Sequence, residues 1–116
     1  MAMTLRQLLG KRGEGAAAKY LKSRGYEIKE TNYRCPFGEV DIIAQHDDVI
    51  AFVEVKTRSG TSFGMPNEAV RSDRKKRYVA CAKYYFSGRE PDVTVRFDVI
   101  EILNGEINHI ESAFTA

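Results

Sequence analysis

Hydrophobic and polar residues alternate most regularly between Gly38 and Thr57, with a polar break at Gln45 to Asp48 in the middle. Alternation with a period of two predicts strands, because successive side chains of a strand point to opposite faces. The segment therefore predicts two antiparallel strands. The tight two-residue turn at Asp47-Asp48 that would join them is the commonest hairpin geometry.

This pairing sorts the side chains of the hairpin onto two faces. One face is apolar, with the facing pairs Val40–Val55, Ile42–Val53 and Ala44–Ala51. The other carries the facing pairs Ile43–Phe52, Asp41–Glu54 and Glu39–Lys56. A slip of one residue would mix the faces, so the pattern supports this parity and leaves a slip of two open. Two carboxylates about 5 Å apart repel by roughly 3 kcal/mol at an effective dielectric of about 20, so Asp41 opposite Glu54 requires a cation or a shared proton.

The remaining pattern predicts two helices and three further strands. They are a helix over Glu14–Arg24, a strand over Tyr26–Arg34, a helix over Asn67–Phe86, a strand over Val93–Leu103 and an edge strand over Glu106–Glu111. Gly10 and Gly13 predict a break before the first helix, although Thr4 and Gln7 also fit a capping box for an earlier start. Ser72-Asp73 resembles an N-cap and leaves open a separate first turn in the second helix.

The order of these elements predicts the fold class. Short turns join the first three strands, which should be antiparallel, and the second helix is long enough to cross over to a parallel fourth strand. The result is a mixed α/β sheet with helices on its faces. A chain of 116 residues is the length of one domain, which we expect to span residues 1–116.

Composition narrows the class of protein. The hydrophobic share of 43% and the charged share of 29% are those of a soluble globular protein. The apolar runs are too short for a membrane span and the N-terminus lacks a secretory segment, so we expect a cytoplasmic protein with no membrane partner. Cys35 and Cys81 lack a partner spacing and are expected to be reduced thiols rather than zinc ligands.

Four charged residues converge in this predicted fold: Glu14 on the inward stripe of the first helix, Asp41 and Glu54 across the hairpin, and Lys56 beside Glu54. Clustered carboxylates suit Mg²⁺ or Mn²⁺, and a lysine there would orient or deprotonate a water that attacks a phosphodiester. Each signal has a plainer interpretation: Glu14 complements the helix dipole, and Glu54 with Lys56 forms an exposed salt bridge. The opposition of Asp41 and Glu54 favours the metal.

The same residues carry a resemblance. Asp41, twelve intervening residues and then Glu54-Val55-Lys56 resemble the signature of the PD-(D/E)xK nuclease superfamily. The flanking motifs resemble the bacterial YraN-like family over nearly the whole chain: G-E-x-x-A-x-x-Y-L at 13–21, N-x-R at 32–34, G-E-V-D-I-I-A at 38–44, F-V-E-V-K-x-R at 52–58, F-G at 63–64, E-A-V at 68–70 and R-F-D-V at 96–99. Val40 stands where the superfamily signature often has proline.

The resemblance implies a restriction-endonuclease-like fold and a relationship to archaeal Holliday junction resolvases. It implies that Glu14, Asp41, Glu54 and Lys56 are the catalytic positions, that the first three hold Mg²⁺ or Mn²⁺, and that the partner is nucleic acid, with DNA favoured over RNA. It also makes a twofold homodimer on a branched substrate plausible.

Basic and aromatic residues extend this hypothesis to a binding surface. The expected phosphate contacts are Lys11, Arg12, Arg34, Arg58, Arg74 and Lys75. A solvated helix face explains the basic run 74–77 equally well. Tyr33, Phe37 and Phe63 are candidates for stacking on bases, with a core position favoured for Phe37.

Three functional hypotheses therefore stand. The first is a structure-selective, metal-dependent DNA endonuclease, favoured by the intact set of four residues. The second is a non-catalytic nucleic-acid-binding module on the same fold, which the modest net charge of +2 leaves open. The third is a protein-interaction domain.

Overall fold

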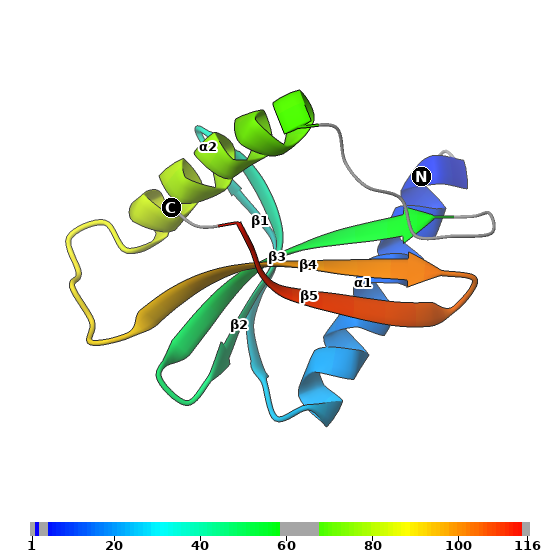
Figure 1. The fold of residues 1–116 in the computed structure, drawn as a ribbon, viewed down its shortest axis with the longest axis horizontal. Helices are drawn as coiled ribbons and strands as arrows, with labels where there is room; N and C mark the ends of the chain where they lie inside the picture. Colours follow the sequence, from blue (N-terminus) through cyan, green and yellow to red (C-terminus); the bar gives the residue numbers. More distant parts are fainter. Residues whose placement is uncertain (1, 3–4, 59–67, 115–116) are drawn as a thin grey trace.

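A five-stranded sheet in the order β1-β2-β3-β4-β5 forms the centre of the protein, with one helix on each face (Figure 1). Along the chain the elements are α1 (Leu5–Ser23), β1 (Glu27–Cys35), β2 (Gly38–His46), β3 (Val49–Arg58), α2 (Glu68–Tyr85), β4 (Thr94–Leu103) and β5 (Glu106–Phe114). This computed structural model describes residues 2, 5–58 and 68–114, with the backbone alone for 5–12, 68–72 and 114.

The strand directions confirm the predicted mixed sheet. The pairs β1–β2, β2–β3 and β4–β5 are antiparallel, and β3–β4, which α2 connects, is parallel. The Asn104-Gly105 turn has positive φ at both residues, 51° and 83°, as a two-residue hairpin of this type requires. No helix within the described ranges is long and apolar enough to cross a membrane.

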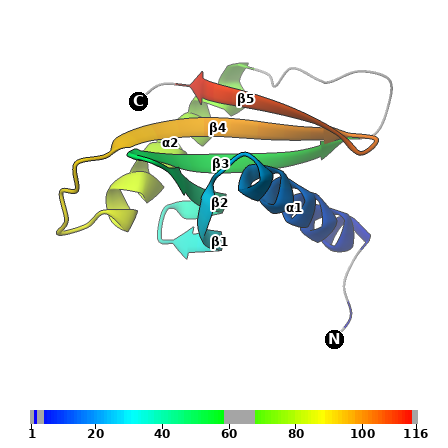
Figure 2. The same cartoon turned by 90° about the horizontal axis from the view of Figure 1, so that it is seen from below.

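Each helix closes a separate hydrophobic core, and the two cores lie on opposite faces of the sheet (Figure 2). On the α1 face, Ala17 and Leu21 pack against the inward residues of β2, β3 and β4: Ile42, Ala44, Ala51, Val53, Ile100 and Ile102. On the α2 face, Tyr78, Cys81 and Ala82 pack against Val40, Ile43, Ile50, Phe52 and Phe97. The alternation of apolar residues along β3 thus supplies both cores.

The two cysteines meet in the core of the α2 face. Both are free, as predicted, but the fold brings Cys35 of β1 to Cys81 of α2, with 2.8 Å between their Sγ atoms. Burial and the neighbouring thiol raise the pKa of Cys81 to about 12, so this thiol is protonated at neutral pH.

The start of α1 differs from the break predicted at Gly10 and Gly13, because the helix runs unbroken from Leu5 through both residues. Gly13 is buried against β3, and a Cβ placed there would lie 2.1 Å from Thr57 Oγ1. The glycine therefore permits a close approach of helix and strand instead of ending the helix. Helix α2 likewise continues through Ser72-Asp73 as one element.

We expect Gly13→Ala to lower the free energy of unfolding by roughly 1–2 kcal/mol, because the overpacking against Thr57 outweighs the gain in helix propensity. Gly15→Ala is the matched control, since a Cβ there meets nothing within 4 Å. The control should gain about 0.5–1 kcal/mol. Urea unfolding of the two variants measures the contrast, and equal stabilisation of both would contradict the close approach.

Candidate active site

The hairpin of β2 and β3 pairs as predicted near its turn and differs from the prediction at its open end. The paired residues run from His46–Val49 to Ile42–Val53, which confirms the turn at Asp47-Asp48. The next predicted pair, Asp41–Glu54, is absent from this register. Instead Asp41 turns its side chain toward β3, and Oδ2 accepts a hydrogen bond of 2.8 Å from Val55 N.

Val40 corrects the predicted faces of this hairpin. Strict alternation places it with Ile42 and Ala44 against α1, but it is fully buried in the core of the α2 face beside Ile43. Its predicted partner, Val55, packs in the other core. The change of face occurs where the pairing of β2 with β3 ends, so β2 departs from a regular strand at the residue next to Asp41.

Glu54 lies at the centre of a group of charges beneath α2. It is 8% exposed, and Oε1 forms ion pairs with Arg74 Nε at 2.9 Å and with Lys56 Nζ at 3.4 Å. The other oxygen, Oε2, is buried and has no hydrogen-bond partner among the residues that the structure describes. A buried carboxylate oxygen without a partner is costly for the fold, and its lone pairs are available to a cation.

Burial disfavours the charged forms of both carboxylates in this site. Burial raises the pKa of Asp41, and the hydrogen bond from Val55 and the cations Lys56 and Arg74 reduce the rise without cancelling it. Burial also raises the pKa of Glu54 despite Arg74 and Lys56, and Asp41 adds to that rise. A further cation would stabilise both carboxylates in their charged form.

Two residues that were not predicted also belong to this region. Tyr78 of α2 is buried, and burial together with the charges of Asp41 and Glu54 raises its pKa above its usual range. Glu101 of β4 is 2% exposed and is the register partner of Lys56. A charge within the apolar run of β4 is the signal that could have identified Glu101, because the same signal identified Asp41 and Glu54.

Glu14 is half-buried on α1, one residue after the close contact of Gly13 with Thr57. Among the described side chains, no three of the His, Cys, Asp and Glu type lie close enough together to hold a metal. The predicted set of three carboxylates, Glu14 with Asp41 and Glu54, is therefore not assembled, and a metal role for Glu14 stays a prediction from the resemblance.

The predicted basic residues take three different positions. Arg74 lies in the charge group on Glu54 instead of on the open surface. Arg34 is exposed, 3.8 Å from Glu39, and Arg58 lies 4.0 Å from Glu101. Lys75 is half-buried on α2. The side chains of Lys11 and Arg12 lie outside the part that the structure describes.

The candidate stacking residues differ in their exposure to solvent. Tyr33 is half-buried and packs edge-on against Tyr85 in the core of the α2 face, with ring centroids 5.5 Å apart. Phe37 is 52% exposed, so the preference for a core position was wrong. Its ring contacts Tyr84 of α2 edge to face. Phe63 lies outside the described residues.

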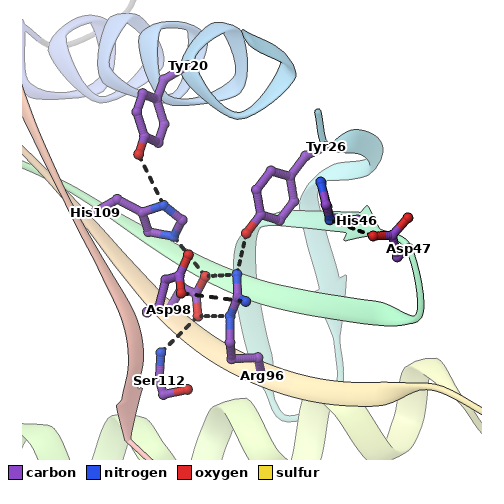
Figure 3. Close-up of polar contacts among 9 residues, drawn as sticks. Tyr20, Tyr26, His46, Asp47, Arg96, Asp98, His109 and Ser112 are labelled. Carbon is purple, nitrogen blue, oxygen red and sulfur yellow. Dashed lines mark hydrogen bonds and ion pairs between the residues drawn. The ribbon is translucent and has the colours of Figure 1, made fainter. Parts of the chain in front are cut away.

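A second polar cluster occupies the α1 side of the sheet, and the sequence analysis missed it (Figure 3). Asp98, fully buried on β4, accepts hydrogen bonds from Arg96 at 2.9 Å twice, from His109 Nε2 at 2.8 Å and from Ser112 N at 3.1 Å. His109 Nδ1 in turn lies 3.4 Å from the Tyr20 hydroxyl. The described partners of Asp98 all belong to β4 or β5, and Tyr20 extends the network to α1. This arrangement indicates a structural role.

An open cavity of about 900 Å³ lies elsewhere, between the C-terminal half of α2 and the start of β4. Its walls include Phe86, Val95 and Phe97 but none of the charges around Glu54. The cavity therefore does not mark the candidate site, which is identified by its buried carboxylates instead.

Comparison with other proteins places the chain in a family. Residues 13–102 match the profile of the uncharacterised protein family UPF0102. A UPF0102 protein of Thermodesulfovibrio yellowstonii is 45% identical over 106 residues, which are 91% of this chain and 95% of the relative. One from Clostridioides difficile is 48% identical over 105 residues, 88% and 92% of the two chains. These matches support the resemblance to the YraN-like family, and the chain belongs to UPF0102.

Proposed function

We propose that this protein is a divalent-metal-dependent nuclease that hydrolyses phosphodiester bonds in DNA. The observation that carries the proposal is the buried, unpartnered Oε2 of Glu54. It accompanies two carboxylates, Asp41 and Glu54, whose pKa values are raised. Raised carboxylate pKa values in a partly accessible cluster are typical of functional sites.

The two carboxylates fit a small divalent cation. Mg²⁺ keeps several waters and takes one or two carboxylates together with substrate phosphate, so Asp41 and Glu54 would suffice to hold it. When bound, the ion would polarise a phosphoryl oxygen and lower the pKa of a water. The resemblance to PD-(D/E)xK nucleases assigns the same two residues, and Mn²⁺ is the alternative ion.

Lys56 supplies the remaining chemistry from the chain itself. Its Nζ lies 3.4 Å from Glu54 Oε1, which fixes the ammonium beside the carboxylates. From there it would orient or deprotonate the attacking water, or stabilise the negative charge on the phosphoryl oxygens in the transition state. The water oxygen joins phosphorus as the ester bond to the leaving oxygen breaks. Resemblance to junction resolvases suggests branched DNA as substrate and a homodimer as the active form.

A non-catalytic nucleic-acid-binding module is the second candidate. The ion pairs from Arg74 and Lys56 to Glu54 favour it, because they balance the carboxylate without any metal. Such a module would bind DNA in a salt-dependent manner, and neither EDTA nor the Asp41→Asn change would affect its binding.

Cleavage assays separate the two candidates. With Mg²⁺ or Mn²⁺ and a panel of branched, duplex and single-stranded DNA and RNA, the nuclease should cleave at least one substrate. Asp41→Asn, Glu54→Gln and Lys56→Ala should each abolish the cleavage, since each removes a metal ligand or the catalytic amine. Asp48→Asn, an exposed carboxylate at the turn of the same hairpin, is the matched control and should retain activity. Wild-type protein that neither binds a divalent ion nor cleaves any substrate would refute the proposal.

A further inference from the structure

Two exposed aromatic rings meet where the turn before β2 contacts α2. Phe37, in the turn between β1 and β2, is 52% exposed, and Tyr84 on α2 is 45% exposed. Their rings meet edge to face with centroids 6.2 Å apart and an angle of 72°. Exposing two large aromatic side chains together is unfavourable in water, so their pairing at one place indicates a contact surface.

The charges around these rings are mostly basic. Arg77 is exposed on α2, and its Cδ lies 3.8 Å from the position that a Cβ at Gly38 would occupy, directly beside the Phe37 turn. Arg34 precedes the turn with 82% of its side chain exposed. Glu39, 3.8 Å from Arg34, is the acidic neighbour. Aromatic faces flanked by guanidinium groups suit bases joined by phosphates.

The platform continues into the candidate site along one stripe of α2. Arg77 precedes Tyr84 by seven residues, two turns on the same side of a helix. Arg74, a turn earlier, contacts Glu54. On the strand side, Phe37 lies in the turn that precedes β2, and four residues of chain span at most about 13 Å from it to Asp41. A nucleotide on the rings would therefore lie within about 13 Å of a phosphate held at Asp41.

We propose that Phe37 and Tyr84 form a stacking platform for an unpaired base of the nucleic-acid substrate, with Arg34 and Arg77 on the adjoining phosphates. The inference rests on the proposed function and narrows its substrate to DNA with unpaired bases near the cleaved bond. Stacking is available to single strands and branch points, because the bases of an intact duplex keep both faces covered. A second copy of this chain fits less well, since it would bring another set of arginines to the same surface.

Binding without cleavage tests the platform. In EDTA, a short single-stranded DNA carrying 2-aminopurine should bind with quenched fluorescence, as stacking requires. Phe37→Ala and Tyr84→Ala should each weaken this binding by about 5- to 100-fold, and Tyr84→Phe should retain it because the ring remains. Ile110→Ala is the control, an exposed apolar residue on β5 at the opposite edge of the sheet, and should bind like the wild type. The same strand annealed to its complement should bind wild type and variants equally.

Several outcomes would overturn the platform. Alanine variants that bind and quench like the wild type would do so, as would an equal loss of duplex binding. A wild-type dimer that Phe37→Ala dissociates, with DNA affinity unchanged, would assign the surface to contact between copies. If metal-dependent cleavage is observed together with any of these results, the proposed nuclease function is retained. Ring-dependent DNA binding by a protein that neither binds a divalent ion nor cleaves any substrate would instead refute the nuclease and retain the platform.

Discussion

Asp98→Ala should lower the free energy of unfolding by about 3–5 kcal/mol, because removing one partner from a buried ionic network leaves the other charge without compensation. Asp98 is 0% exposed and accepts hydrogen bonds from Arg96, His109 and the Ser112 amide. The loss is a large fraction of the ordinary stability of a domain, about 5–15 kcal/mol. Urea unfolding followed by circular dichroism measures it.

A graded series keeps this prediction testable if the alanine variant fails to fold. Tyr20→Phe removes only the outermost hydroxyl, 3.4 Å from His109 Nδ1, and should cost about 0.5 kcal/mol. Asp92→Ala, an exposed aspartate just before β4, should change stability by less than about 0.5 kcal/mol. An Asp98→Ala loss no larger than that of Asp92→Ala would show that the network is not structural.

Lowering the pH should remove the stability that Asp98 contributes. Burial by itself raises the pKa of Asp98, but the hydrogen bonds from His109 and Arg96 outweigh it and hold the pKa below its usual value. A lowered carboxyl pKa contributes stability above the pKa of the unfolded chain, and that contribution is lost as the pH falls through the folded pKa. The gap between wild type and Asp98→Ala should therefore narrow in acid below about pH 4.

Mn²⁺ should raise the Tm of the wild type at pH 7.5, by on the order of 10 °C when the ion is at about a hundred times its Kd. Asp41→Asn should lose this rise, and Asp48→Asn should retain it. The rise should shrink toward pH 5, since protons compete with the metal for carboxylates whose pKa values are raised. Differential scanning fluorimetry at the two pH values measures all three proteins.

In the metal-free protein, Asp41 should change stability with pH in the direction opposite to that of Asp98. A carboxyl group with a raised pKa contributes stability below the unfolded pKa, and the contribution is lost as the pH rises through the folded pKa. At pH 7.5 without metal, Asp41→Asn should therefore be at least as stable as the wild type, because the amide oxygen still accepts from Val55 N and carries no charge. A clearly less stable Asp41→Asn would contradict the burial cost of the Asp41 charge, and a variant that keeps the full Mn²⁺ effect would contradict the proposed metal site.

The pattern of apolar and polar residues predicted the sheet, because strand register and direction depend here on residues that are close together in the sequence. Alternation around Asp47-Asp48 determined the hairpin register, and the helix between β3 and β4 determined their parallel pairing. The error at Val40 coincides with a contact that the alternation does not predict: the Asp41 side chain, not a backbone carbonyl of β2, accepts the hydrogen bond from Val55 N. The break predicted at Gly13 was wrong for a related reason. A glycine is required there because Thr57, on another element, leaves no room for a Cβ.

The candidate site was predicted in part. Asp41, Glu54 and Lys56 stood out as charges within apolar strands, and the structure brings Glu54 and Lys56 together with Arg74 from α2. The contribution of Arg74 could not be predicted, because a basic run on a helix does not reveal which residue faces the sheet. Asp98 and Glu101 carried the same signal of a charge in an apolar strand and were overlooked. The exposure of Phe37 depends on how far α2 extends over the turn, which is a property of packing.

The pairing of β2 with β3 ends beside Asp41, and this divides the hairpin into two halves with different roles. The half from Ile42–Val53 to the turn holds the sheet through backbone pairing, which depends little on side-chain identity. In the other half, burial of the Asp41 and Glu54 carboxylates costs folding free energy instead of supplying it. We therefore expect conservative replacement of Asp41 and Glu54 to preserve the architecture. Under the proposed function, family membership reports the fold, and positions 41, 54 and 56 carry the chemistry.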